Sequence, residues 1–409
     1  MLSENSKEQK LRSFKGRRLA MVKAALSVAS SDLLPRNPVP VNRMLEADLA
    51  EIKGVRTWGD QYCQLFRDDI KKSICQEPGS KYALKSDDTA AYNILALSGG
   101  GANGAFGAGF LYGWTKAGTR PEFKIVTGIS SGAIIAALAF LGAEYDELLK
   151  EIYTTVTEWN IYNKKNVLSL ICNESFADIK PLEKLIRKYV DKTILKAIAK
   201  AHSNGKRLYV GTANLDAQRP VVWNMGAIAC SDHPDALKLF CKILLASVSI
   251  PCIFPPVYFE VEAAGQFYDE MHVDGGMIAD VFICDFMLDF PIVTQNDPKP
   301  RNALYIIRND KFMPSTKRGS HSLSKITERV LSSFNMAHCD DHLCRIYAAA
   351  RQNNTDFNYT GIPKNCELPD NLIFDRNEMN GLFNLGVRLA KSDYKWHSTL
   401  PGFEKITRK

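Results

Sequence analysis

The chain has 409 residues, of which 45% are hydrophobic and 24% charged, so it can bury a large core in one α/β domain with extensions or in two domains. The 52 lysine and arginine residues exceed the 45 acidic ones by seven, a mild bias that favours an anionic membrane surface over a neutral one. No nucleic-acid motif accompanies this charge, which excludes nucleic acid from the expected partners. There is also no run of about 18 apolar residues, so we expect no transmembrane helix and only peripheral contact with membranes.

The ten cysteines include no C-x-x-C pair and no spacing typical of small secreted domains. We therefore expect reduced, buried thiols, as in a reducing compartment or in a core that needs no disulfide. Residues 1–34 are basic and sparsely apolar, and Arg17–Lys23 imitates a signal peptide until Lys23 interrupts the apolar stretch. We expect no secretion signal there and no lipoprotein cysteine. These features predict a cytoplasmic protein or an effector secreted without a Sec signal peptide.

The predicted elements begin with an extended strap at residues 36–40, which contain two prolines. A polar surface loop is expected over residues 76–90. Beyond it, apolar runs predict strands at 92–97, 123–127, 207–213, 256–261 and 303–308 and helices at 102–116, 131–141, 321–351 and 377–391. Such alternation indicates an α/β fold with a largely parallel sheet and helices on both faces.

Residues 181–202 predict two short amphipathic helices. The first carries Lys184, Arg187 and Lys188 opposite an apolar stripe, and Asp191 is expected to cap the second. The basic faces could dock on anionic lipid, or they could simply be solvated while the apolar sides cover the core. Both interpretations stay open.

Two glycine-rich segments each follow a predicted strand and precede a predicted helix. They are Ser98–Gly109 (SGGGANGAFGAG) and Gly128–Gly132 (GISSG). The second is a G-x-S-x-G turn, on which Ser130 would stand exposed in a strained elbow with glycines on either side. In the first, glycines at a helix start present free N–H groups at the positive end of the helix dipole, which suits a developing oxyanion. The alternative is a tight packing turn.

A third segment reads His272-Val273-Asp274-Gly275-Gly276. An aspartate held by glycines at a strand end can accept a serine proton if its pocket is dry enough to make the carboxylate basic. Asp-Gly-Gly alone is also a plain turn signal. His272 would share a strand face with Asp274, so it could instead act as an imidazole base.

The segments GGGANG, GISSG and DGG, in this order, resemble the oxyanion loop, nucleophile elbow and dyad aspartate of the patatin-like phospholipase family. The resemblance covers most of residues 36–403 and looks like a bacterial branch. It implies a three-layer sandwich and a phospholipase A-type acyl hydrolase of membrane phospholipids or other acyl lipids, with Ser130 as nucleophile and Asp274 as general base and acid. The other implied site residues are Gly99, Gly100, Gly101, Ala102, Asn103 and Gly104 in the oxyanion hole, Gly128 and Gly132 in the elbow, and Gly275 and Gly276 in the dyad loop.

One position departs from the family. The family often carries arginine or lysine where this chain has Asn103. Because asparagine supplies no charge, we expect oxyanion stabilisation to depend on the backbone of Gly100, Gly101 and Ala102.

The resemblance also suggests a division of the chain. We expect an N-terminal extension and strap over 1–90, a catalytic domain over 91–310 and a C-terminal helical part over 311–409 packed on it. Residues 247–257, with three prolines, would form a rigid loop beside the acyl pocket.

Several alternatives stay open. The same acyl-enzyme could serve an acyltransferase, or the chain could be a catalytically silent scaffold of this fold. Some bacterial patatin-like toxins need a host protein for activity, so an activating host partner is a further possibility. No cofactor or metal is expected, although His338 and His342, one helical turn apart, could bind zinc.

Overall fold

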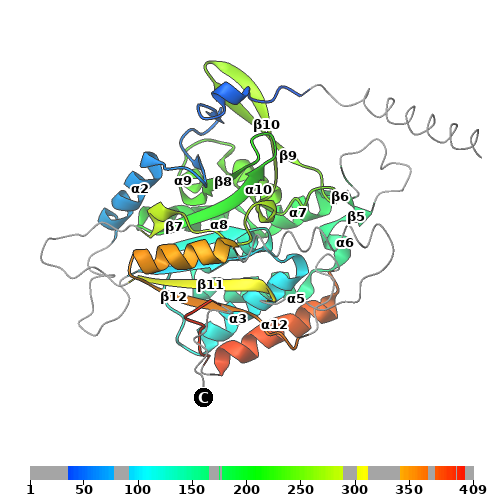
Figure 1. Ribbon diagram of the computed structural model, residues 1–409. Coiled ribbons are helices and arrows are strands. Elements are labelled where there is room, and N and C mark those ends of the chain that lie inside the picture. Colours follow the sequence, from blue (N-terminus) through cyan, green and yellow to red (C-terminus); the bar gives the residue numbers. More distant parts are fainter. Residues whose placement is uncertain are drawn as a thin grey trace, which may run out of the picture.

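The central feature of the fold is one large sheet between layers of helices, which confirms the predicted α/β class (Figure 1). The computed structural model describes residues 36–77, 92–164, 175, 177–288, 302–311, 341–366, 374–392 and 394–400. The predictions for residues 1–34, for most of 76–90 and for 321–340 lie outside the described residues, and so does His338.

The elements follow the predicted order closely from the first core strand onward. The strands of the main sheet are β1 (Asp48–Leu49), β2 (Arg56–Trp58), β3 (Asn93–Leu97), β4 (Ile125–Ile129), β7 (Arg207–Asn214), β8 (Arg219–Asn224), β9 (Val257–Ala263), β10 (Gln266–Asp274), β11 (Asn302–Lys311) and β12 (Thr355–Ile362). A small separate sheet pairs β5 (Asn163–Lys164) with β6 (Ala177–Asp178).

Helices fill most of the connections between these strands. They are α2 (Gln64–Cys75), α3 (Gly104–Lys116), α4 (Ser131–Leu141), α5 (Asp146–Thr155), α6 (Glu158–Ile161), α7 (Lys180–Tyr189), α8 (Lys192–Ser203), α9 (Met225–Ala229), α10 (Ala236–Ser247) and α12 (Arg376–Lys391), and residues 341–352 are also helical. Asp191 caps α8 as predicted, because its side chain accepts hydrogen bonds from the N–H groups of Thr193 and Ile194.

The sheet is mixed, whereas the sequence predicted a largely parallel one. Its strand order is β1-β9-β10-β7-β4-β3-β11-β12, with β8 paired to β7 and β2. The pairs from β7 through β4, β3 and β11 to β12 are parallel. The other pairs are antiparallel. Two of them are hairpins, in which a tight turn at Ala264 and Gly265 joins β9 to β10 and a short turn joins β7 to β8. Strands β3 and β4 thus end side by side in the parallel part, so the two glycine-rich segments that follow them meet at the same edge.

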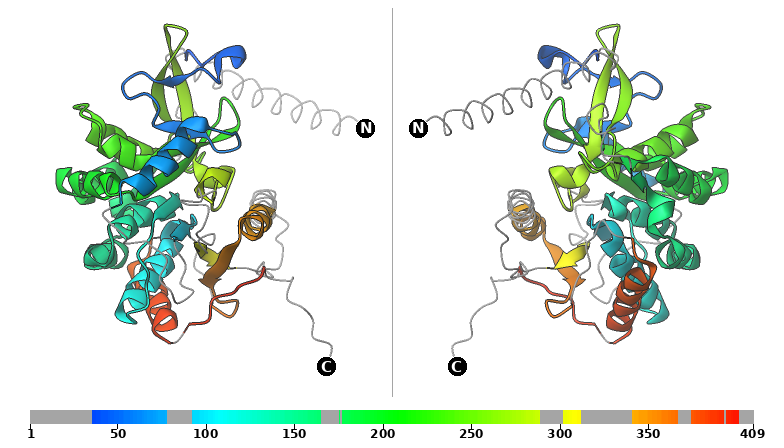
Figure 2. Two further views of the ribbon diagram at one scale, coloured as in Figure 1. Left: turned by 90° about the vertical axis from the view of Figure 1, so that its left-hand side faces the viewer. Right: turned by 90° about the vertical axis from the view of Figure 1, so that its right-hand side faces the viewer.

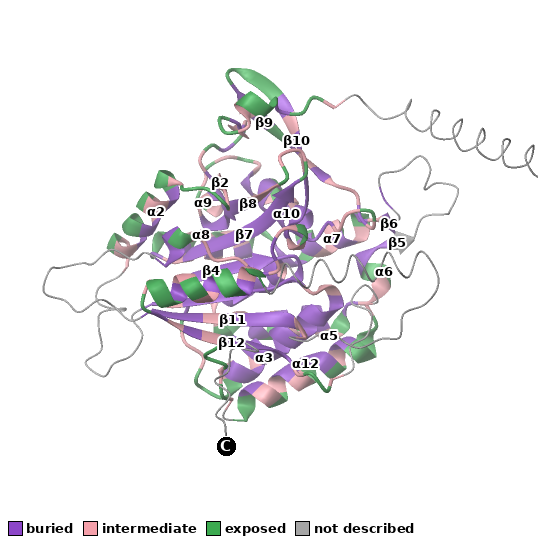
Figure 3. Ribbon diagram, in the orientation of Figure 1, coloured by how far each residue is buried: buried purple, intermediate pink, exposed green. Residues whose placement is uncertain are grey.

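The two faces of the sheet are covered by different helices. In β3, Leu95 and Leu97 pack with α3, α4 and α12, whereas Ile94 and Ala96 pack with α2 and the 341–352 helix. In Figure 2 the 341–352 helix (orange) lies on the opposite side of the sheet from α3 (cyan) and α12 (red). Figure 3 shows the strands between them buried over most of their length. Burial on both faces explains why these strands read as continuous apolar runs in the sequence.

Helix α3 is rich in glycine and alanine because α12 crosses it at close range. A Cβ atom on Gly109 would clash with the carbonyl of Phe383, and one on Gly113 would clash with the carbonyl of Val387. The C-terminal helix α12 is therefore fixed directly against the helix that follows the glycine-rich segment after β3.

Several strands were not predicted: β1, β2, β5, β6, β8 and β12. Strand β12 lies in the stretch for which the sequence indicated only helices, and it extends the sheet by pairing in parallel with β11.

No helix in the described part of the chain is long and apolar enough to cross a membrane.

Candidate active site

Ser130 stands at the junction between β4 and α4. Its backbone has φ 55° and ψ −131°, a left-handed conformation that costs a non-glycine residue about 1–3 kcal/mol. Neighbouring residues stabilise this strained backbone. The Ser130 N–H donates a 3.0 Å hydrogen bond to Ser247 Oγ, and the Ser247 hydroxyl donates to the carbonyl of Gly211 at 2.7 Å. A Cβ on Gly132 would clash with the carbonyls of Ser98 and Leu97, so the elbow packs directly on the loop after β3.

The hydroxyl of Ser130 faces the carboxyl group of Asp274 at the end of β10. Ser130 Oγ donates a 2.6 Å hydrogen bond to Asp274 Oδ2, and the Gly276 N–H donates to Oδ1 at 2.7 Å. Both side chains are buried, so the prediction of an exposed Ser130 is wrong. Burial, with a smaller contribution from the negative charge of Asp280, raises the pKa of Asp274 to about 7 against the opposing effect of these two hydrogen bonds. This carboxyl group is therefore poised to exchange a proton near neutral pH.

His272 lies on the same strand but makes no hydrogen bond to Ser130. Its Nδ1 is 2.9 Å from Thr212 Oγ1, and its Nε2 is 3.1 Å from Glu270 Oε2. Glu270 in turn forms an ion pair with Arg56. Burial lowers the pKa of His272, although Glu270 opposes this effect. The imidazole is thus part of a buried network that ties β10 to β7, and its geometry does not favour the role of an imidazole base for Ser130.

The loop after β3 presents three backbone N–H groups without a partner. In the described part of the chain, no hydrogen bond engages the N–H groups of Gly100, Gly101 and Ala102. By contrast, the N–H of Gly99 donates to the carbonyl of Asp280 at 3.2 Å, and the N–H of Asn103 donates to that of Gly100 at 2.9 Å.

Gly104 and Asn103 were also predicted in the oxyanion hole, but the backbone N–H groups of both are occupied. The Gly104 N–H bonds within the short 3-10 helix η2 (Gly101–Asn103), and Oδ1 of the buried Asn103 side chain has no hydrogen-bond partner. Of the six predicted oxyanion residues, only three have a backbone N–H free for a ligand in the described structure, and these are the three on which we expected stabilisation to depend.

A residue that the sequence did not single out holds this loop in place. Asn309, near the end of β11, donates from Nδ2 to the carbonyl of Ser98 at 2.8 Å and accepts the N–H of Gly107 at 2.9 Å. Its own N–H donates to Ser98 Oγ, and a Cβ on Gly100 (φ 150°) would lie 2.6 Å from its carbonyl oxygen. A polar Arg308-Asn309 pair at the end of an apolar strand run is the signal that could have identified it.

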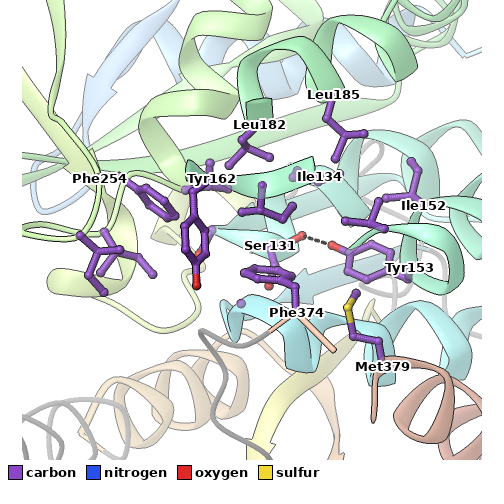
Figure 4. Close-up of a pocket in the computed structure, with 17 residues that line it drawn as sticks. Ser131, Ile134, Ile152, Tyr153, Tyr162, Leu182, Leu185, Phe254, Phe374 and Met379 are labelled. Atoms are coloured by element: carbon purple, nitrogen blue, oxygen red, sulfur yellow. Dashed lines mark hydrogen bonds between the residues drawn. The ribbon is translucent and has the colours of Figure 1, made fainter. Parts of the chain in front are cut away.

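An apolar pocket opens beside Ser130 on the face covered by α3, α4 and α7 (Figure 4). Besides Gly101, Ser130 and Ser131, it is lined by Ile134, Ile152, Tyr153, Val156, Ile161, Tyr162, Leu182, Leu185, Val248, Ile250, Ile253, Phe254, Phe374 and Met379. Polar groups are few, and the Tyr153 hydroxyl is occupied because it donates to the Ser131 carbonyl at 3.0 Å. As predicted, the loop over 247–257 contributes to the wall. A pocket of this character suits a hydrocarbon chain.

In the described residues, no three histidine, cysteine, aspartate or glutamate side chains lie in positions to hold a metal ion together. His338 of the alternative zinc pair lies outside them.

Comparison with known proteins gives a family match for part of the chain. Residues 95–287 match the profile of the family described as Patatin-like phospholipase. A search of curated proteins gives no match.

Similar solved structures include VipD from Legionella pneumophila, with 13% identity over 72% of this chain and 67% of that one and a TM-score of 0.30. The type III effector protein ExoU of Pseudomonas aeruginosa has 13% identity over 75% of this chain and 54% of that one, with a TM-score of 0.29. Human GIVD cytosolic phospholipase A2 has 11% identity over 63% of this chain and 48% of that one, with a TM-score of 0.30. This chain spans about two thirds of VipD and about half of the other two.

Proposed function

We propose that the chain, whose residues 95–287 match the patatin-like phospholipase family, is a phospholipase A-type hydrolase that cleaves acyl esters of membrane phospholipids with Ser130 and Asp274. The observation that carries this proposal is the 2.6 Å hydrogen bond between Ser130 Oγ and Asp274 Oδ2, beside an apolar pocket. Family membership supports lipid hydrolysis in general. The dyad, the oxyanion donors and the acyl pocket are our assignments.

The reaction would begin with proton transfer from Ser130 Oγ to Asp274 Oδ2 as the oxygen attacks the ester carbonyl carbon. The negative charge that develops on the carbonyl oxygen would be stabilised by the N–H groups of Gly100, Gly101 and Ala102. When the tetrahedral intermediate collapses, the carboxylic acid of Asp274 would return the proton to the departing alcohol. This leaves the acyl group on Ser130 and releases the lysolipid.

Water would then attack the acyl-enzyme. Asp274 would take one proton from the water as a new tetrahedral intermediate forms, and it would return that proton to Ser130 Oγ as the fatty acid leaves. One carboxyl group can act as base and acid in turn because its pKa of about 7 leaves both protonation states accessible at neutral pH.

The test is fatty-acid release from mixed phospholipid vesicles by the purified protein and by Ser130→Ala and Asp274→Asn. Both variants should lose turnover, and a fluorophosphonate probe should label the wild type but not Ser130→Ala. Ser203→Ala, an exposed serine at the end of α8, is the matched control and should behave as wild type. An active Ser130→Ala variant would refute the proposal.

Two additional arms address the alternatives. Eukaryotic lysate added to an otherwise silent protein tests for an activating host partner, which we retain as a proposal together with the expected cytoplasmic or effector location. An alcohol acceptor added to an active protein tests for acyl transfer, because an acyltransferase would form the new ester faster than free fatty acid.

A further inference from the structure

Helices α7 and α8 carry a local excess of positive charge. Residues 180–203 carry a net charge of +5, whereas the whole chain carries +7. The cations are Lys180, Lys184, Arg187, Lys188, Lys192, Lys196 and Lys200, and all seven are exposed. We call this set the basic face.

The lysines of the basic face are spaced four residues apart in each helix. They occur at Lys180, Lys184 and Lys188 in α7 and at Lys192, Lys196 and Lys200 in α8. Like charges at i and i+4 lie next to each other on a helix and destabilise it. A helix surface that is merely solvated usually mixes the two signs of charge, which avoids this repulsion.

Few carboxylates neutralise the basic face. Arg187 pairs with Glu183 at 3.0 Å, and Lys188 lies 3.7 Å from Glu151. Within the ranges that the structure describes, no ion pair engages the side chains of the other five lysines. The surface thus carries a net positive charge that an anionic partner would neutralise.

The opposite sides of the same helices are apolar and packed. Ile194 and Ile198 of α8 are buried in the core, while Leu182 and Leu185 of α7 line the pocket beside Ser130 (Figure 4). Because both helices pack on one face of the sheet, both turn their lysines outward. The basic face of α7 therefore forms the outer surface of the pocket wall.

We propose that the basic face is a docking surface for anionic phospholipid membranes. It would hold the protein on the bilayer with the acyl pocket directly beneath the contacting helix. A bilayer fits better than a small ligand, because cations spread over two consecutive helices need a partner with extended negative charge. The inference rests on the proposed function for its substrate, but its binding step can be measured without turnover.

Binding should be measured by cosedimentation with vesicles, using Ser130→Ala so that no lipid is consumed. This protein should bind vesicles of about 70:30 phosphatidylcholine and phosphatidylserine, should not bind phosphatidylcholine alone, and should dissociate as salt increases. The variant Lys184→Gln/Lys188→Gln/Lys196→Gln should bind on the order of 100-fold more weakly. Its thermal midpoint should be unchanged or higher, since like-charge repulsion is relieved.

The matched control is Lys72→Gln/Arg388→Gln/Lys391→Gln, which removes three exposed cations from α2 and α12. It should lose much less affinity. An equal loss in both triple variants would mean that only net charge matters and would overturn the proposal, as would equal binding to neutral vesicles. Binding to RNA or an acidic protein without binding to anionic vesicles would also overturn it.

Activity separates this proposal from the proposed function. With Ser130 intact, the lysine variant should hydrolyse a soluble short-chain ester at the wild-type rate and lose activity only on anionic vesicles. Silence of the wild type on every ester, with intact vesicle binding, would refute the hydrolase while leaving the docking surface.

Discussion

The side-chain amide of Asn309 donates a hydrogen bond to the carbonyl oxygen of Ser98, 2.8 Å away. The same amide accepts the N–H of Gly107 at 2.9 Å, so one side chain joins the start of the glycine-rich loop to the first turn of α3. Asparagine can do this because it offers a donor and an acceptor on a short stem. The arrangement of the three unpartnered N–H groups between these two points therefore depends on a residue from another strand.

Asn309→Asp tests this dependence. Aspartate keeps the acceptor for Gly107 but replaces the donor to Ser98, so the loop should lose its geometry. We expect kcat to fall about 10- to 100-fold with little change in KM, because the loop is proposed to act on the transition state. Steady-state kinetics and the rate of fluorophosphonate labelling of Ser130 would measure this effect. Asn353→Asp, in a surface turn, is the control and should behave as wild type. A 10- to 100-fold rise in the KM of Asn309→Asp with unchanged kcat would contradict the assignment.

The pKa of Asp274 predicts the pH dependence of acylation. The carboxylate must be ionised to accept the Ser130 proton, so kcat/KM should fall about tenfold per pH unit below a midpoint near 7. Asp280→Asn removes a negative charge that raises this pKa, so the acid limb should move to lower pH. Profiles of kcat/KM on a soluble ester would check both. A profile that did not move in Asp280→Asn would show that Asp280 has no such influence.

The same raised pKa has a consequence for stability. A carboxyl group with a pKa of about 7 in the folded protein and an ordinary pKa of 3.8 stabilises the native state below its unfolded pKa, and this contribution is lost as the pH rises through 7. Asp274→Asn removes the buried charge, so it should be more stable than wild type at pH 8, by up to about 4 kcal/mol. The difference should shrink as the pH falls from 7 toward 4. Urea unfolding at several pH values would measure it, and a constant difference at all pH values would argue against a titrating Asp274.

The pocket beside Ser130 predicts acyl-chain selectivity. Leu185→Trp would fill part of the pocket from α7, so turnover should shift toward esters of shorter fatty acids. Competition between short- and long-chain esters would show this as a change in the ratio of kcat/KM. Leu215→Trp, at a partly exposed position that does not line this pocket, should leave the ratio unchanged.

The sequence predicted those parts of the site that depend on local chain geometry. The elbow at Ser130 and the helix over 131–141 were predictable because glycine spacing and apolar periodicity act within a few residues. Asn309 was not, since its partner Gly107 lies 202 residues away in the chain. Strand β12 was missed for the same reason: its place in the sheet is determined by pairing with β11. The occupied N–H of Gly99 likewise depends on a distant carbonyl, that of Asp280.

The position of Ser130 and Asp274 on β4 and β10 has a consequence for how the protein acquires activity. Strand β7 lies between these two strands, and Asp274 is opposite Thr212 of β7 in the β10–β7 register. The two residues are 144 positions apart, so they meet only after both pairings of β7 have closed. A nascent or partly folded chain therefore contains the serine and the aspartate without an assembled pair, and any capacity to cleave lipid arises only when this part of the sheet is complete.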